Sequence, residues 1–107
     1  MTEPQSPPPI PAPEENEEVR RLQEDGWSLT REPEALKREF RFANFPEAFA
    51  FMTQIAIQAE SVNHHPEWKN VWNRVEITWT THDAGGISAL DLEMAAFCDR
   101  LFARHGS

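Results

Sequence analysis

Three of the four histidines in this chain lie close together: His64 and His65 are adjacent, and His82 follows a run of alternating β-branched residues. The imidazole group titrates near neutral pH, so such a cluster can donate and accept protons in a reaction. Glu60 precedes His64 by four residues, a spacing that places both side chains on one face of a helix. These residues therefore favour general acid and base catalysis.

The same side chains could instead hold a metal, since three imidazoles and the carboxylate of Glu60 are suitable ligands for zinc. Adjacent residues such as His64 and His65 usually point in different directions, however, and the chain has no H-x-x-x-H pair and no companion thiolates. Each histidine alone also has an ordinary explanation, because imidazoles are favourable near helix ends. Proton transfer is the leading interpretation, and a metal site is the alternative.

Periodic spacing of apolar residues predicts the helices and strands that must position the histidines. Gly26 stands where a first helix would stop, and Pro66 forbids continuation of a central helix, which is expected to end near His64. The predicted helices span residues 17–25 and 45–64, and a last helix starts at Ser88. The predicted strands lie near residues 27–30, 36–42, 68–72 and 74–81.

The resulting order, αββαββα, predicts an α+β fold built as a two-layer sandwich. A four-stranded antiparallel sheet forms one layer, and the helices pack on one of its faces. The strand ending at Thr81 would deliver His82 to the edge where the central helix also ends. The three histidines are therefore expected to converge there.

Length and composition indicate one domain that follows an N-terminal segment of different composition. A chain of 107 residues is close to the usual size of a single domain. Residues 1–16 contain six of the nine prolines and no basic side chain, a composition that cannot bury enough apolar surface to become ordered. We predict a disordered leader over residues 1–16 and a single domain over residues 17–107.

The charge and hydropathy patterns exclude several partners. A net charge of -8 argues against direct binding of nucleic acid, which needs clustered lysine and arginine. No segment has the length of apolar sequence that spans a bilayer, and no signal peptide is visible, so the expected location is the cytoplasm, without a membrane partner. The single cysteine, Cys98, lies in an apolar helical run and is predicted to be buried.

A longer pattern is more specific than the histidines alone. It comprises Glu60-Ser-Val-Asn-His-His-Pro-Glu-Trp68, Asn70-Val-Trp-Asn73, Thr80-Thr-His-Asp83, Gly85-Gly86 and Asp91. This pattern resembles the active-site signature of the pterin-4a-carbinolamine dehydratases, and a looser likeness covers most of residues 17–104. Two departures are Trp72, where the family often has tyrosine, and Asn63, where the family varies with aspartate. The leader has no part in the resemblance.

The resemblance implies an enzyme that removes water from 4a-hydroxytetrahydropterin to give quinonoid dihydropterin, in the recycling of tetrahydrobiopterin. It implies a pterin substrate and no cofactor. Hydroxide is a poor leaving group, so an acid must protonate the C4a oxygen while a base takes a proton from a ring nitrogen. The motif positions imply that His64 and His82 are this acid and base, in either order, and that His65 binds and orients the pterin.

The resemblance also implies a set of substrate-binding residues: Glu60, Asn63, Pro66, Trp68 and Asp91. Pro66 and Trp68 would form an apolar wall against the flat ring, and Glu60 would orient an imidazole or accept hydrogen bonds from the pterin. Asp91 has a competing explanation, because Ser88-x-x-Asp91 is also a capping box at the start of a helix. Trp68 likewise could be an ordinary core aromatic residue.

An alternative function is a non-catalytic or moonlighting scaffold for protein interaction and assembly, because some members of the family act as binding partners. All three histidines are present here, which favours a working enzyme. The unpaired edges of a four-stranded sheet invite pairing with another copy. The family resemblance implies a homodimer or a homotetramer, and the sequence does not choose between them.

Overall fold

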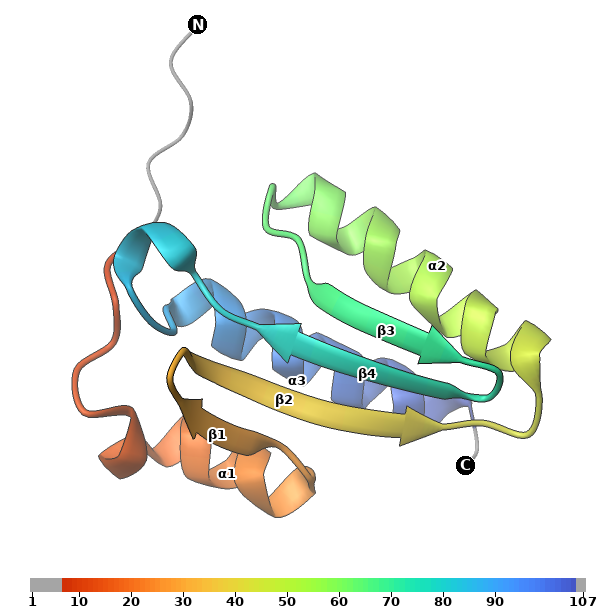
Figure 1. Ribbon diagram of the computed structural model, residues 1–107, viewed down its shortest axis with the longest axis horizontal. Coiled ribbons are helices and arrows are strands. Elements are labelled where there is room, and N and C mark those ends of the chain that lie inside the picture. Colours follow the sequence, from red (N-terminus) through yellow and green to blue (C-terminus); the bar gives the residue numbers. More distant parts are fainter. Residues whose placement is uncertain (1–6, 106–107) are drawn as a thin grey trace, which may run out of the picture.

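The computed structural model of this chain describes residues 7–105. Its helices are the 3-10 turn η1 (Pro13–Glu15), α1 (Glu17–Asp25), α2 (Phe45–Ser61), the 3-10 turn η2 (His82–Ala84) and α3 (Ala89–Arg104). Its strands are β1 (Ser28–Arg31), β2 (Glu34–Arg41), β3 (Glu67–Val71) and β4 (Arg74–Trp79). Figure 1 shows the sheet in front of α3, with α2 running beside it. The predicted α+β fold and its element order are confirmed.

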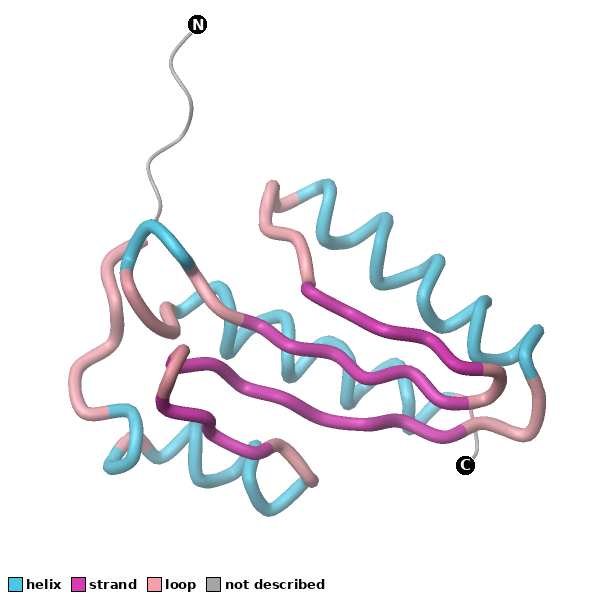
Figure 2. Tube along the Cα trace, viewed as in Figure 1, coloured by secondary structure: helices cyan, strands magenta, loops and turns pink. Residues whose placement is uncertain are grey.

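The four strands form one antiparallel sheet in the order β1-β2-β4-β3 (Figure 2). Alternate residues of β4, Val75, Ile77 and Trp79, are fully buried, as the two-residue period of a strand requires. The residues between them face the other side, where Glu76 pairs with Lys37 of β2 at 3.7 Å. The helices therefore cover one face of the sheet and leave a charged face open.

The core between sheet and helices is rich in aromatic rings. Phe40 of β2 lies with its ring centroid 5.0 Å from Phe51 of α2 and 5.0 Å from Phe102 of α3. Phe40 and Phe51 are almost completely buried, and burial of such a side chain contributes roughly 1.5–3 kcal/mol. Truncation of Phe40 to alanine should cost about 3–5 kcal/mol, because it would empty a contact shared by the sheet and both long helices.

Cys98 of α3 lies in the same core and is fully buried. Burial raises the pKa of its thiol to about 12, so the thiolate form is suppressed at neutral pH. The prediction of a buried cysteine is confirmed. Among the helices of residues 7–105, none has both the length and the apolar character needed to cross a membrane.

The central helix ends earlier than its apolar period predicted. Helix α2 stops at Ser61, Val62 caps it, and Asn63 adopts a left-handed backbone with φ of 52°. This turn takes His64 off the helix, so the expected common helical face of Glu60 and His64 does not form. Asparagine tolerates the left-handed region better than most residues, which explains why the helix can break one residue before the histidines.

The leader has contacts that its composition did not predict. The backbone N–H of Ile10 donates to the carbonyl of Ile87 at 3.0 Å, and Pro9 forms an isolated antiparallel bridge with Ser88. Ile10 packs against the core, and Pro13 in η1 is buried. Residues 9 and 10 therefore lie against the start of α3, within the segment 1–16 for which the sequence predicts disorder. The part of that prediction concerning residues 1–6 lies outside the described residues.

Candidate active site

His64 follows α2 and is held by a buried carboxylate. Its Nε2 lies 2.5 Å from Oδ1 of Asp91, whose side chain has no exposed surface, whereas 12% of the His64 side chain is exposed. The imidazole also stacks on the buried ring of Trp79, with centroids 5.7 Å apart and planes inclined by 23°. Because a carboxylate accepts the hydrogen from Nε2, the opposite ring nitrogen, Nδ1, is left to exchange a proton.

Asp91 lies in the first turn of α3 and closes the end of that helix. Its Oδ2 accepts hydrogen bonds from the backbone N–H of Ser88 at 2.8 Å and from Oγ1 of Thr81 at 2.7 Å. The capping box predicted from Ser88-x-x-Asp91 is confirmed. A buried carboxylate is costly unless it is hydrogen-bonded, and both oxygens of Asp91 have partners. Asp91 lies behind His64 and its side chain has no exposed surface, while its predicted role as a substrate contact stays a prediction.

A tight loop brings Thr81 to Asp91 and exposes the next residue, His82. The backbone of Thr81 and Gly86 forms an isolated antiparallel bridge, closed by an N–H···O bond of 3.0 Å. An added Cβ at Gly86 would lie 2.2 Å from Oε2 of Glu34, so the Glu34 carboxylate, which accepts a hydrogen bond from the backbone N–H of Ile87, would have to move. The loop thus turns one threonine inward and one histidine outward.

His82 has its own carboxylate partner at the beginning of the edge strand β3. Its Nε2 lies 2.8 Å from Oε2 of Glu67, and the two side chains are 72% and 55% exposed. Glu67 pairs in register with Thr78 of β4, two residues before Thr80. The sheet register therefore fixes where Glu67 stands relative to the strand that leads to His82.

His65 pairs with Glu60, which the helical spacing of the sequence had matched to His64. Its Nε2 lies 2.7 Å from Oε1 of Glu60, and both side chains are more than half exposed. The left-handed turn at Asn63 carries His64 inward to Asp91 and leaves His65 beside the last turn of α2. Glu60 is thus in place to orient an imidazole, one of the two roles expected for it.

The end of α2, the beginning of β3 and the turn η2 lie toward one end of the molecule (Figure 1). His64 and His65 lie between α2 and β3, and His82 begins η2. Hydrogen bonds and chain neighbours connect them. Thr81, the residue before His82, binds Asp91, and Asp91 holds His64. Glu67, which holds His82, lies two residues after His65. Each ring is bonded through Nε2 to a different carboxylate. No Nδ1 of the three has a hydrogen-bond partner within residues 7–105.

The other predicted binding residues surround this end without bonding to the histidines. Asn63 is exposed, Pro66 is half-buried, and Trp68 is half-buried with its ring packed against the core. Trp68 faces the same side of the sheet as its register partner Ile77. Its core packing agrees with the ordinary interpretation of this tryptophan, and its exposed part remains accessible to a ligand.

The donor set does not form a metal centre among the described residues. No group of three or more histidine, cysteine, aspartate or glutamate side chains in residues 7–105 is arranged to hold a metal ion. Each imidazole Nε2 is occupied by a carboxylate instead of facing the other imidazoles. The arrangement is suited to fixing the tautomer of each ring.

Sequence reasoning missed three residues that shape the site: Glu67, Thr81 and Trp79. Glu67 stands inside the His-His-Pro-Glu-Trp run, so its position in the motif was the available signal. Thr81 precedes His82, but nothing in a single strand reveals that its hydroxyl reaches a carboxylate ten residues later. The alternation along β4 indicates only that Trp79 is a buried aromatic residue, and the structure adds that His64 stacks on it.

The structure is thus an αββαββα sandwich in which three histidines near one end of the sheet are each paired with a carboxylate. A family model for pterin 4 alpha carbinolamine dehydratase matches residues 9–101 of this chain. The chain belongs to this family.

Two sequence relatives are provisionally named pterin-4-alpha-carbinolamine dehydratases. One, from Rhizobium leguminosarum bv. trifolii, is 51% identical over 81 residues, which cover 76% of this chain and 80% of the relative. The other, from Burkholderia vietnamiensis, is 52% identical over 77 residues, which cover 72% of this chain and 76% of the relative. The similarity thus extends over most of both proteins.

Two solved structures share the fold. A protein from Brucella melitensis, described as a transcriptional coactivator/pterin dehydratase, is 42% identical with a TM-score of 0.79, covering 87% of this chain and 97% of that one. A pterin dehydratase-like protein, described as a RuBisCO assembly factor in the alpha-carboxysome, is 24% identical with a TM-score of 0.63, covering 77% of this chain and 92% of that one. The second likeness concerns the fold alone.

Proposed function

We propose that this chain catalyses the dehydration of 4a-hydroxytetrahydropterin to quinonoid dihydropterin, a step in the recycling of tetrahydrobiopterin. The observation that carries the proposal is the bonding of three neighbouring histidines to three carboxylates, one of which, Asp91, is completely buried. Membership of the dehydratase family and the names of the relatives support the same reaction. The reaction as proposed needs no cofactor.

In this reaction the C–O bond at C4a breaks and a C=N bond forms between C4a and the adjacent ring nitrogen. One of the pair His64 and His82 protonates the departing oxygen, while the other removes the proton from the nitrogen, so water leaves and the charges balance. Each transfer of this kind is typically worth ~10²–10⁴ in rate. The carboxylates at Nε2 support the transfers, because they orient each ring and leave Nδ1 for the substrate.

The remaining residues hold the pterin in this scheme. His65, oriented by Glu60, hydrogen-bonds the substrate, and Asn63 offers an exposed amide beside it. Pro66 and the exposed part of Trp68 contact the flat ring. Asp91 acts as a positioning residue, because its carboxylate contacts His64 and has no surface for a ligand.

The direct test is the rate of dehydration of 4a-hydroxytetrahydropterin, followed optically, for the parent and for His64→Ala and His82→Ala. Each variant should lose most of the acceleration, on the order of 10²–10⁴. His105→Ala is the matched control, since the fourth histidine packs against Phe42 and Phe51 near the C-terminus of α3. Circular dichroism confirms that each variant is folded. A parent that is no faster than buffer would refute the enzymatic function.

A second candidate function is that of an interaction scaffold. The relative from Brucella melitensis is described as a transcriptional coactivator as well as a dehydratase. In this chain α2 exposes large apolar side chains, Phe45, Phe49 and Ile57, to between 44% and 67%, and exposed apolar patches commonly mark protein contacts. The two functions are compatible, because none of these side chains belongs to the histidine site.

We also propose that the chain forms homodimers or homotetramers through a sheet edge. Strand β3 is an edge strand, and Val71 and Trp72 at its end are 45% and 64% exposed. Light scattering after size exclusion should give the mass of a dimer or tetramer, and Val71→Lys with Trp72→Glu should lower it. A monomeric parent would contradict the proposal.

A further inference from the structure

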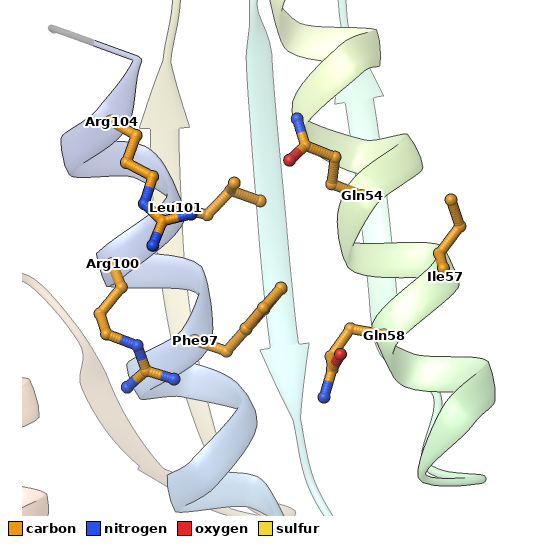
Figure 3. Close-up of a pocket in the computed structure, with 7 residues that line it drawn as sticks. All are labelled: Gln54, Ile57, Gln58, Phe97, Arg100, Leu101 and Arg104. Carbon is orange, nitrogen blue, oxygen red and sulfur yellow. The ribbon is translucent and has the colours of Figure 1, made fainter.

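A groove of about 480 Å³ lies between α2 and α3, away from the histidines. Figure 3 shows Phe97 and Leu101 of α3 pointing into the space between the helices, and Gln54 and Gln58 of α2 facing them. Ile57, 67% exposed, stands at the rim on α2. The groove therefore has an apolar floor and amide groups along one wall.

The opposite wall carries positive charge. Arg100 and Arg104 line the groove from α3, and both are exposed. Neither arginine has an ion pair or hydrogen bond within residues 7–105. Asp99, the residue before Arg100, is bound instead by Arg38 at 2.6 Å and by the indole of Trp27. Two neighbouring unpaired arginines are a local exception on a chain of net charge -8.

The residues that line the groove recur at intervals of about one helical turn. Its three rows are pairs of residues four apart: Gln54 and Gln58, Phe97 and Leu101, and Arg100 and Arg104. A third helix that lies between α2 and α3 could contact all three rows at once. Its side chains recur every three to four residues, so neighbouring faces of the helix can meet the floor and both walls. An extended segment presents only two opposite faces and could not contact the floor and both walls together.

We propose that this groove binds an amphipathic acidic helix of another protein. Apolar side chains of that helix cover Phe97 and Leu101, and carboxylates one turn apart pair with Arg100 and Arg104. Arginine is well suited to such contacts, since its guanidinium group binds a carboxylate through two parallel hydrogen bonds. Aromatic and arginine side chains are also the residues most often found at the centre of protein interfaces.

The helices of residues 7–105 do not offer the complementary surface to a second copy. Helix α3 lines the groove itself, and of its acidic residues Asp91 is buried and Asp99 is bound to Arg38. The acidic residues of α2 are Glu47 and Glu60, which lie at its two ends, so α2 cannot present carboxylates one turn apart. Helix α1 is acidic, but its apolar residues Val19 and Leu22 are buried in its own core. The charge pattern of the groove therefore favours a foreign helix.

The test uses a fluorescein-labelled peptide of about 18 residues, designed as a helix of about five turns. It carries a leucine row beside glutamates one turn apart, and a sister peptide has lysine in place of each glutamate. Fluorescence anisotropy with the full chain should give saturable binding of the acidic peptide alone. R100E with R104E should weaken it by about tenfold or more, and R100Q with R104Q by less.

The matched control is R20E with R21E, which changes the net charge equally on the exposed side of α1. It should leave binding within about twofold, and no variant of this set should alter the dehydration rate. Equal binding of the lysine peptide would show that the peptide charges do not matter, and an equal loss in R20E with R21E would show that only the net charge of the protein matters. Either outcome would overturn the proposal. A fall in molar mass of R100E with R104E would assign the groove to a second copy and would also overturn it.

Discussion

The pairs His64–Asp91 and His82–Glu67 have the same chemistry and opposite surroundings. The side chains of the first pair are 12% and 0% exposed, whereas those of the second are 72% and 55% exposed. An exposed pair contributes about 0–1 kcal/mol, because water screens the charges and the side chains lose freedom. The carboxylate of Asp91 has no water to replace its partners, so breaking any of its bonds leaves a buried polar group without a partner.

The difference indicates which parts of the site the fold imposes. Asp91 is bonded to groups from the end of α2, the end of β4 and the beginning of α3, so its position depends on all three being in place. Glu67 contacts His82 from an exposed edge strand and can move without disturbing the core. We infer that His64 is rigidly oriented and that His82 can adjust to a substrate.

The largest expected effect comes from replacing each carboxylate by its amide. In Asp91→Asn one oxygen becomes an N–H donor, which must face either Nε2–H of His64 or the donors Ser88 and Thr81, so the tautomer of His64 is no longer fixed. The turnover number should fall roughly 10²-fold or more. Glu67→Gln should cost no more than about fivefold, since its amide oxygen still accepts from His82 in an exposed pair.

Steady-state kinetics with the pterin substrate, together with thermal melting, measure this pair of variants. Loss in kcat with nearly unchanged KM is expected for Asp91→Asn, because Asp91 acts through His64 and not on the bound pterin. Equal losses in the two variants would show that burial does not distinguish the pairs.

A smaller effect should follow from removing the hydroxyl that supports Asp91. Thr81→Val deletes the 2.7 Å bond to Oδ2, and we expect a loss of about 1–3 kcal/mol in the free energy of unfolding with a several-fold lower kcat. Thr80→Val is the matched control, since Thr80 donates to the backbone of Glu34 at 2.8 Å and has no bond to the carboxylate. Urea denaturation and turnover assays compare them, and an unchanged Thr81→Val would argue against a tightly held Asp91.

The N-terminal segment offers a gentler way to loosen the same region. Ile10 is bonded to Ile87, next to the cap of α3, so deletion of residues 1–12 should cost about 1 kcal/mol and lower the melting temperature by about 4–8 °C. Deletion of residues 1–6 retains these contacts and serves as the control. Calorimetry distinguishes the two truncations. Identical melting temperatures would indicate that the contacts of Ile10 contribute nothing to stability.

The smallest effect concerns Asp99, a carboxylate between the two extremes of burial. Burial raises its pKa above the ordinary 3.8, although the bonds from Trp27 and Arg38 lower it. The folded state therefore holds this proton more tightly than the unfolded chain. The associated stability is present at low pH and is lost as the pH rises from about 3.8 through the raised pKa.

Asp99→Asn removes this titration, so its free energy of unfolding should fall less steeply than that of the parent over that interval. Denaturant titrations at a series of pH values provide the slopes. Glu93→Gln, at an exposed carboxylate of the same helix, should follow the parent. Parallel curves for the parent and Asp99→Asn would contradict the raised pKa.

The helices and strands were accessible from the sequence because they depend on near neighbours. Apolar spacing within a turn predicted α1, and Gly26, with φ of 121°, ends it where expected. Alternation along β4 predicted which side chains are buried. The capping box at Ser88 was equally local, since its two partners are three residues apart. In each case the deciding contacts lie within one turn or one pleat.

The candidate residues were also named from the sequence, through the motif that contains His64, His65 and His82. Their partners were not. The bonds from His64 to Asp91 and from His82 to Glu67 join residues 27 and 15 positions apart, and such distances carry no periodic signal. They form only when α2, the sheet and α3 are packed together.

The exchange of partners at the end of α2 has the same origin. Helical spacing assigned Glu60 to His64, but the left-handed backbone at Asn63 gave Glu60 to His65 and turned His64 toward the interior. The sequence determined the elements, the types of the candidate site residues and the family. Only the tertiary structure decided which histidine is buried, because burial depends on what the other layer places over each side chain.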